Sequence, residues 1–251
     1  MAGHSKWANT KHRKARADAQ KGKIFTKLAR ELTVAAREGG PDLETNFTLR
    51  LAVQKARDNN MPSDNIQRAI QKGSGGQDGP KYDQASLEGY AVGGVAVLLE
   101  TMTDNRNRTV AEIRHIFSRH DGSLGESGCV AWMFNRKGYL TVHKSDLEID
   151  EDDLILQAAD AGAEDVETED EETYSIVTEI ENFEDVKNKL GAQMIPIASA
   201  EVTMLPVNTI EITESDAADK IINLMEALDD HDDVQNVYAN FDIPSELLLK
   251  Q

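Results

Sequence analysis

Apolar residues recur at a helical spacing near the start of the chain. Ile24, Leu28, Leu32 and Ala35 share one face of a helix that ends at Gly39. Two shorter segments with the same spacing follow, and a glycine-rich stretch comes after them. These two segments cover residues 46–58 and 63–72. Three helices joined by short turns predict a small helical domain.

After residue 80 the pattern changes to strands that alternate with helices. Residues 135–205 predict the order βαββαβ, which is that of a ferredoxin-like unit. Residues 81–134 and 206–251 together predict a second such set, with a strand at 130–134. The predicted fold class is therefore α+β multidomain, with an N-terminal three-helix domain followed by two ferredoxin-like α/β domains, one inserted in the other. The predicted domains are residues 1–80, residues 81–134 plus 206–251, and the insertion 135–205.

Charge is distributed unevenly along this pattern. Residues 1–72 contain fifteen Lys and Arg against seven Asp and Glu, although the whole chain has a net charge of −18. The first part attracts polyanions and the remainder repels them. Such a division is expected of a protein that holds phosphates at one place and does not coat them elsewhere.

The basic part begins with a polar arm, residues 2–21, in which cations for phosphates alternate with planar groups that can stack on bases. The candidate nucleic-acid-binding residues in this arm are Lys6, Trp7, Lys11, His12, Arg13, Lys14, Arg16 and Lys21. A solubilising tail is the alternative. Lys23, Lys27 and Arg30 lie opposite the apolar face of the first helix, so we expect them to continue the arm as a basic ridge exposed to solvent.

A second candidate lies at a strand-to-helix turn. Asn105, Arg106, Asn107 and Arg108 could converge on an anion together with backbone N–H groups. The alternative, which is equally favoured, is a helix cap by Asn107 with surface ion pairs.

Residues 145–190 contain eighteen acidic side chains against two lysines. A solvated surface is the simplest interpretation. The acidic region could also dock a basic protein, or keep the body of the molecule away from nucleic acid.

The sequence predicts neither an enzyme nor a cofactor. Glycines at 73–79 lack the Gly-Lys-Ser/Thr of a phosphate-binding loop, and Cys129 has no identifiable base. The acidic run 229–233 around His231 offers oxygen ligands, but a solvated turn is the favoured interpretation and no metal is predicted. No apolar run is long enough for a membrane span, no secretory signal is recognisable, and a cytoplasmic location is expected.

Five separated runs occur together in this chain: 2–7 (AGHSKW), 59–66 (NNMPSDNI), 89–96 (GYAVGGVA), 103–109 (TDNRNRT) and 234–241 (VQNVYANF). In combination they resemble the YebC/PmpR family, whose relatives include a mitochondrial translational activator of cytochrome c oxidase. The resemblance spans the whole chain. It implies a helical N-terminal domain, two α/β domains and a non-enzymatic regulator of gene expression.

The resemblance leaves two functions open. One is a DNA-binding transcriptional regulator, the conventional description of the family. The other is a translation factor that binds ribosomal RNA or tRNA and assists synthesis of difficult sequences such as proline-rich ones. In that case the acidic lobes would face basic ribosomal proteins. The absence of an obvious recognition helix favours RNA slightly, and the family name favours DNA.

Overall fold

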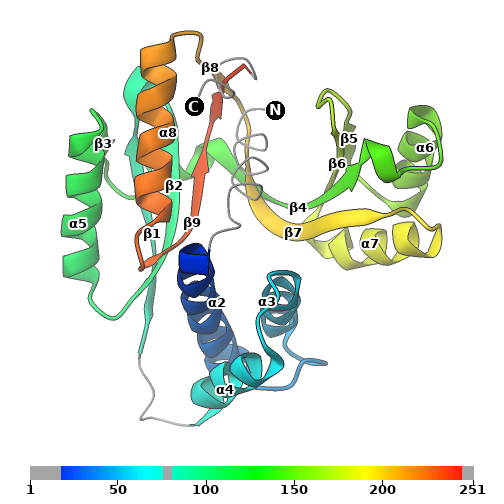
Figure 1. Cartoon of the computed structure of the whole chain (residues 1–251), viewed down its shortest axis with the longest axis horizontal. Helices are drawn as coiled ribbons and strands as arrows, with labels where there is room; N and C mark the ends of the chain where they lie inside the picture. Colours follow the sequence, from blue (N-terminus) through cyan, green and yellow to red (C-terminus); the bar gives the residue numbers. More distant parts are fainter. Residues whose placement is uncertain (1–17, 76–80, 245–251) are drawn as a thin grey trace. The chain divides into compact units, whose positions relative to one another are not determined.

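The computed structural model describes residues 18–75 and 81–244, with side chains from residue 22 onward (Figure 1). Contacts divide the described chain into two units. Residues 133–208 form one unit, and the remaining described residues, which include the N-terminal helices, form the other. The predicted boundaries of three domains stay a prediction.

The three predicted helices are present in the N-terminal region. They are α2 (Asp18–Gly39), α3 (Phe47–Asp58) and α4 (Ser63–Ser74). Leu32 and Leu49 are fully buried in their shared core. Asn46 caps α3: its Oδ1 accepts a hydrogen bond from the backbone N–H of Leu49 at 3.0 Å, and its amide donates to the carbonyl of Ala35 at 2.8 Å. This one side chain therefore starts α3 and ties it to α2.

Helices α2 and α4 approach closely at Gly73. A Cβ at this position would lie 2.3 Å from the carbonyl oxygen of Thr33, a distance that no side chain tolerates. The Thr33 hydroxyl also donates to the carbonyl of Ala69 at 3.2 Å. Small residues on α4 therefore set the spacing of the two helices, as in other close helix contacts.

The same unit contains a four-stranded antiparallel sheet with the order β3-β1-β2-β9. Its strands and helices are β1 (Asp83–Tyr90), β2 (Ala96–Thr103), α5 (Arg106–Arg119), β3 (Ser123–Leu124), α8 (Ser215–Asp229) and β9 (Val234–Ala239). Two short strands, β8 (Ile210–Glu211) and β10 (Phe241–Asp242), pair with each other. Leu99, Ile113, Phe117, Ile221 and Val234 are fully buried between the sheet and the two helices.

One strand of this sheet comes from an unexpected place. The sequence predicts a strand at 130–134, but residues 131–133 form a 3-10 turn and β4 begins only at Phe134. The central position between β2 and β3 is taken by β1, residues 83–90. The strand order still matches a ferredoxin-like unit, with its third strand supplied from earlier in the chain. Alternating polarity did not identify β1, because its first half is largely exposed.

Glu88 on β1 fixes the loop that stands in place of the predicted strand. Its carboxylate accepts hydrogen bonds of 2.6–2.7 Å from the backbone N–H groups of Gly128, Val130 and Ala131. Burial raises the pKa of Glu88, but these three bonds outweigh burial and hold it below its ordinary value. The loop at 128–131 thus depends on one ionised side chain.

Residues 133–208 form the second sheet, with the antiparallel order β5-β6-β4-β7. Its elements are β4 (Phe134–His143), α6 (Glu151–Ala161), β5 (Asp165–Glu167), β6 (Thr173–Thr178), α7 (Phe183–Ala192) and β7 (Ile197–Pro206). Sequence and strand order are those of the predicted ferredoxin-like unit. The predicted fold class, a three-helix region followed by two mixed α/β sheets, is confirmed.

Candidate nucleic-acid interface

Most of the predicted basic arm lies outside the described residues. Lys6, Trp7, Lys11, His12, Arg13, Lys14 and Arg16 belong to residues 1–17, and the side chain of Lys21 is also outside the described part. Their role in binding stays a prediction. The candidates on α2 and in the turn before α5 can be examined directly.

The three cations of the α2 ridge each face a carboxylate from the turn between α8 and β9. Their nitrogens lie 3.3, 3.5 and 2.9 Å from a carboxylate oxygen of the partner. The pairs, in that order, are Lys23–Asp230, Lys27–Asp229 and Arg30–Asp233. We call residues 229–233 the acidic turn. It belongs to the same unit as α2, although about 200 residues separate the two in the sequence.

Exposure differs among the cations of these ion pairs. The side chain of Lys23 is 48 % exposed, whereas those of Lys27 and Arg30 are 15 % and 19 % exposed. The expectation of a solvent-exposed ridge is therefore right for Lys23 and wrong for Lys27 and Arg30. The acidic turn covers these two cations, and the helix pattern gave no sign of it.

Asp233 is the centre of this contact. Its Oδ1 accepts from Arg30 at 2.9 Å, and its Oδ2 accepts from Arg108, Thr103 and Thr109 at 2.7–3.0 Å. Burial raises the pKa of Asp233, but the bonds from Arg108, Thr109 and Thr103 lower it to about 2. Asp233 thus joins two predicted candidates, Arg30 and Arg108, through one carboxylate.

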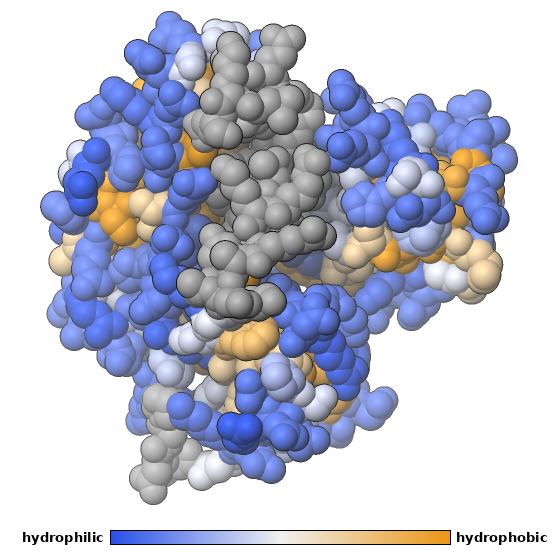
Figure 2. Space-filling model, viewed as in Figure 1, coloured by the Kyte–Doolittle hydropathy of each residue, from blue (hydrophilic) through white to orange (hydrophobic). Residues whose placement is uncertain are grey.

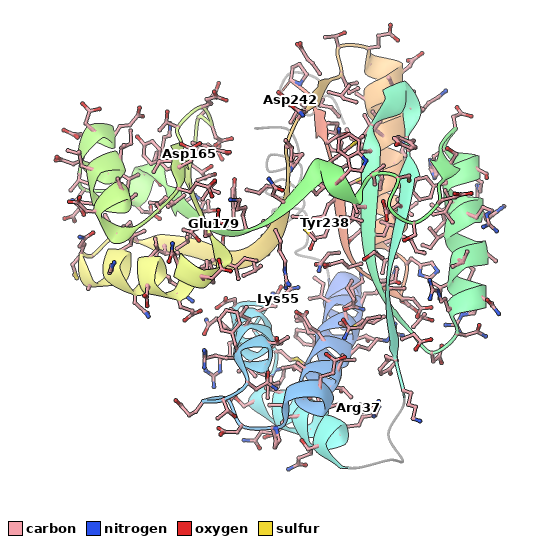
Figure 3. The ribbon with its side chains drawn as sticks, turned by 180° about the vertical axis from the view of Figure 1, so that it is seen from behind. Arg37, Lys55, Asp165, Glu179, Tyr238 and Asp242 are labelled. Carbon is pink, nitrogen blue, oxygen red and sulfur yellow. The ribbon has the colours of Figure 1, made fainter. Side chains whose placement is uncertain are left out.

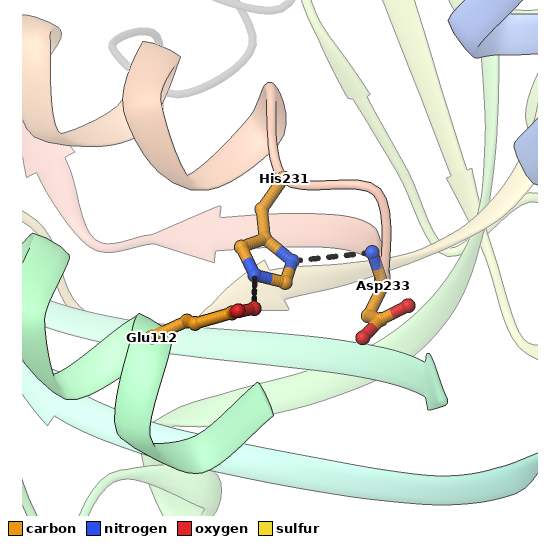
Figure 4. A group of neighbouring side chains, drawn as sticks. All are labelled: Glu112, His231 and Asp233. Atoms are coloured by element: carbon orange, nitrogen blue, oxygen red, sulfur yellow. Dashed lines mark hydrogen bonds and ion pairs between the residues drawn. The ribbon is translucent and has the colours of Figure 1, made fainter. Parts of the chain in front are cut away.

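Glu112, His231 and Asp233 lie close together beside this centre (Figure 4). His231 Nε2 is 2.9 Å from Glu112, and Nδ1 accepts a hydrogen bond from the backbone N–H of Asp233 at 3.1 Å. A metal ion would need free lone pairs at all three residues. Those of Asp233 already accept from two guanidinium and two hydroxyl groups, so the donor set suits a hydrogen-bonded ion-pair network.

The start of α5 is a capped helix with ion pairs, which is the alternative to an anion site. The capping residue is not the predicted one. Asn105, not Asn107, accepts from the backbone N–H of Arg108 at 3.1 Å. Arg108 pairs with both Asp104 and Asp233, and these bonds raise its pKa. Arg106 and Asn107 are exposed. The two arginines of this turn therefore do not converge on one vacant position.

A groove of about 420 Å³ lies between α2 and α4 and was not predicted from the sequence. It combines apolar and aromatic side chains with cations. Phe25, Met61, Asn65, Arg68, Lys72 and Tyr82 are among the residues that line it. Spacing within one helix could not reveal this groove, because its walls come from two helices and the segment before β1.

The remaining cations of the helices show a mixed pattern. Lys55 on α3 pairs with Glu31 of α2 at 3.2 Å, and Arg37 lies near the C-terminal end of α2 (Figure 3). In the view of Figure 2 the described surface is mainly hydrophilic, with hydrophobic patches on both units.

The acidic character predicted for residues 145–190 belongs to the unit at 133–208. Asp165 lies on β5 and Glu179 just after β6, and both are exposed (Figure 3). Lys137 on β4 contacts Glu164 and Glu179 at 2.5 and 2.6 Å. One lysine thus forms ion pairs with two carboxylates. The surface of this unit keeps a strong negative charge, because its acidic side chains greatly outnumber its lysines.

The described helices and sheets place the chain among mixed α/β proteins, with a three-helix region and two four-stranded antiparallel sheets. Within residues 18–75 and 81–244, no helix has both the length and the apolar character that crossing a membrane requires. The fold is shared by a solved structure, a conserved hypothetical protein from Aquifex aeolicus. It is 47 % identical, with a TM-score of 0.82 over 92 % of this chain and 93 % of that one.

Comparison with known protein families identifies the family of this chain. Residues 5–76 match the TACO1/YebC protein N-terminal domain, and residues 82–241 match the TACO1/YebC second and third domain. This chain belongs to the TACO1/YebC family, as its motifs predicted.

Two curated relatives illustrate how members are named. A protein from Natranaerobius thermophilus is 57 % identical over 249 residues, covering 99 % of both chains. One from Halothermothrix orenii is 56 % identical over 248 residues, covering 99 % of this chain and 98 % of the relative. Both carry the name "Probable transcriptional regulatory protein", which denotes a non-enzymatic class.

Proposed function

We propose that this chain is a non-enzymatic regulator of gene expression that binds nucleic acid through its basic N-terminal part. The observation that carries the proposal is the separation of charge: an excess of eight positive charges in residues 1–72 within a chain of net charge −18. Binding of a polyanion is then confined to one part of the molecule by repulsion from the rest. The names of the relatives favour DNA and transcription as its setting.

Within this proposal the arm makes the main contacts. Lysines and arginines between residues 6 and 16 neutralise phosphates, and Trp7 and His12 stack on bases or sugars. Lys23 extends the track, since its ion pair with Asp230 is exposed and easily exchanged for a phosphate. Lys27 and Arg30 contribute only when a phosphate displaces the acidic turn.

A second candidate function is a translation factor on ribosomal RNA or tRNA. The observation that favours it is the acidic unit at 133–208, because a surface with this charge attracts basic proteins of the kind that bind RNA. Crosslinking in cells, followed by sequencing of both RNA and DNA, separates the two. Enrichment of ribosomal RNA over promoter fragments would decide for translation, and the reverse would decide for transcription.

Salt titration tests the shared part of the proposal. If six to eight phosphates are neutralised, log K on duplex DNA should fall against log salt with a slope of about −5 to −7. Deletion of residues 2–21 removes the arm and the first four residues of α2, but none of the described residues of the helical core. It should abolish binding and leave the thermal unfolding midpoint nearly unchanged.

A charge-matched pair of variants guards against a general electrostatic effect. Lys6→Gln with Lys11→Gln should reduce the magnitude of the slope by about 2. Lys187→Gln with Lys220→Gln removes the same charge from the body of the protein and should leave the slope as it is. Equal effects of the two pairs, or a deletion variant that binds like the full chain, would refute the role of the arm.

A further inference from the structure

Beside Arg30, which pairs with Asp233, the groove between α2 and α4 contains two cations whose charge is not compensated. Arg68 and Lys72 are exposed and line it, and neither has an ion-pair partner among the described residues. Within the described part of the chain, no Asp or Glu lines the groove. The described helical region therefore presents positive charge to solvent here, whereas Lys27 and Arg30 are neutralised by the acidic turn.

Two aromatic rings accompany these cations. Phe25 lies on α2 and Tyr82 on the segment that leads into β1, and both are half-buried in the groove. The guanidinium of Arg30 lies 5.5 Å from the centroid of the Tyr82 ring, a cation–π distance. Arg30 is itself fixed by Asp233 and by the carbonyl of Asp232 at 2.6 Å. The position of the Tyr82 ring is thus set by the contact between the helices and the sheet.

A polar group without a partner completes the lining. The side-chain amide of Asn65 makes no hydrogen bond to any described residue, and the apolar residues Ala29, Met61 and Ala69 line the same groove. An amide can both donate to and accept from the edge of a base. The volume, about 420 Å³, lies within the range of roughly 300–1,000 Å³ typical of small-ligand sites.

Rings, cations and an amide in one groove match the chemistry of a single unpaired nucleotide. Stacking platforms flanked by positive charge are how proteins hold single-stranded nucleic acid. The bases of a duplex would not enter this groove, because paired bases keep their faces stacked on each other. An acidic peptide would use the cations but would leave the two rings and the amide without a role.

We propose that this groove binds one unpaired nucleotide of a single strand: Phe25 and Tyr82 contact the base, Arg68 and Lys72 the adjacent phosphates, and Asn65 the base edge. The inference rests on the proposed function, since it names the form of nucleic acid that the N-terminal part holds. It places a second contact on the folded helices, separate from the arm.

The experiment uses the full chain and short single strands, of RNA and of DNA, that carry one 2-aminopurine. Stacking in the groove should quench the fluorescence of this base. Tyr82→Leu keeps an apolar side chain without a ring and should weaken single-strand binding by about 10-fold, within the roughly 5- to 150-fold range of one stacked base. The quench should be lost and the salt slope should stay unchanged. Tyr82→Phe should behave like the original chain.

The cations are tested separately. Arg68→Gln with Lys72→Gln should lower the magnitude of the salt slope by about 1 to 2. Arg68→Gln and Lys72→Gln are also made singly, and Arg57→Gln, which removes one exposed cation of α3 outside the groove, is the charge-matched control for each of them. Unfolding midpoints of all variants, compared with that of the original chain, exclude loss of structure as the cause.

Clear outcomes would overturn the inference. A folded Tyr82→Leu variant that binds single strands like the original chain, with the quench intact, would refute it, as would groove variants that lose only the binding of a poly-glutamate peptide. The deletion of residues 2–21 separates this failure from failure of the proposed function. If the deletion abolishes binding and the groove variants do not, the proposed function stands without the groove; if the original chain binds no nucleic acid, both are wrong.

Discussion

Helices α2 and α4 contain cations of the same types but in different states. On α2, Lys27 and Arg30 contact carboxylates of the acidic turn and are largely covered. On α4, Arg68 and Lys72 line the groove and have no ion-pair partner among the described residues. The comparison teaches that a lysine or arginine is available to a phosphate where the fold leaves it exposed, and not where a carboxylate both neutralises and covers it.

The covered side should contribute strongly to stability. Asp233→Asn would leave Arg30 without its carboxylate and weaken the bonds from Thr103 and Thr109, so we expect a loss of about 3 kcal/mol in the free energy of unfolding. Urea unfolding measures it. Asp232→Asn, at an exposed neighbour, should stay within about 0.5 kcal/mol. Similar values for the two variants would contradict a central role of Asp233.

Lowering the pH should gradually remove the stabilisation that the Asp233 carboxylate provides. The pKa of Asp233 is lowered from 3.8 to about 2 in the folded chain, so its stabilisation is fully present above about pH 4 and is lost as the pH falls through about 2. The expected size is about 2 kcal/mol. Unfolding of the original chain and of Asp233→Asn at pH 5 and pH 2.5 tests it. Their difference in stability should shrink at the lower pH, and a constant difference would show that the carboxylate does not titrate as described.

Uncovering the ridge should convert it partly into a binding surface. Asp229→Asn with Asp230→Asn removes the carboxylates that neutralise Lys23 and Lys27 and leaves their contacts to backbone carbonyls, so binding to nucleic acid should strengthen a few-fold and the salt slope should grow in magnitude by about 1 to 2. Filter binding at several salt concentrations measures both. Asp152→Asn with Asp153→Asn removes equal charge from α6 and is the control. An identical gain in this control would mean that net charge, not release of the lysines, is responsible.

Local patterns predicted much of the fold. The three helices, α5, α8 and the complete ferredoxin-like set at 133–208 follow from periodicities of 3.6 and 2 together with turn residues. The strand expected at 130–134 and the missed strand β1 are errors of another kind. The position of β1 depends on pairing with β2 and β3, and Glu88 fixes the loop at 128–131 through three backbone bonds that no local pattern indicates.

The candidate site shows the same limit. Candidate cations were identified from residue type. Asn105 was correctly placed between a strand and a helix, but Arg106, Asn107 and Arg108 form the first turn of α5 rather than the loop before it. Asp233 was grouped with a solvated turn, although it is buried and binds both Arg30 and Arg108. Its partners come from three elements, so its neighbours in sequence carry no information about them.

The sequence by itself determined the family, the class of fold and the separation of a basic beginning from an acidic body, because these depend on composition, motifs and short-range periodicity. Tertiary structure decided which cations are neutralised and which line a groove with Phe25 and Tyr82. The physical reason is range: ion pairs and stacking act over a few ångströms in space. Residues such as Lys27 and Asp229, about 200 positions apart, meet only after the chain has folded.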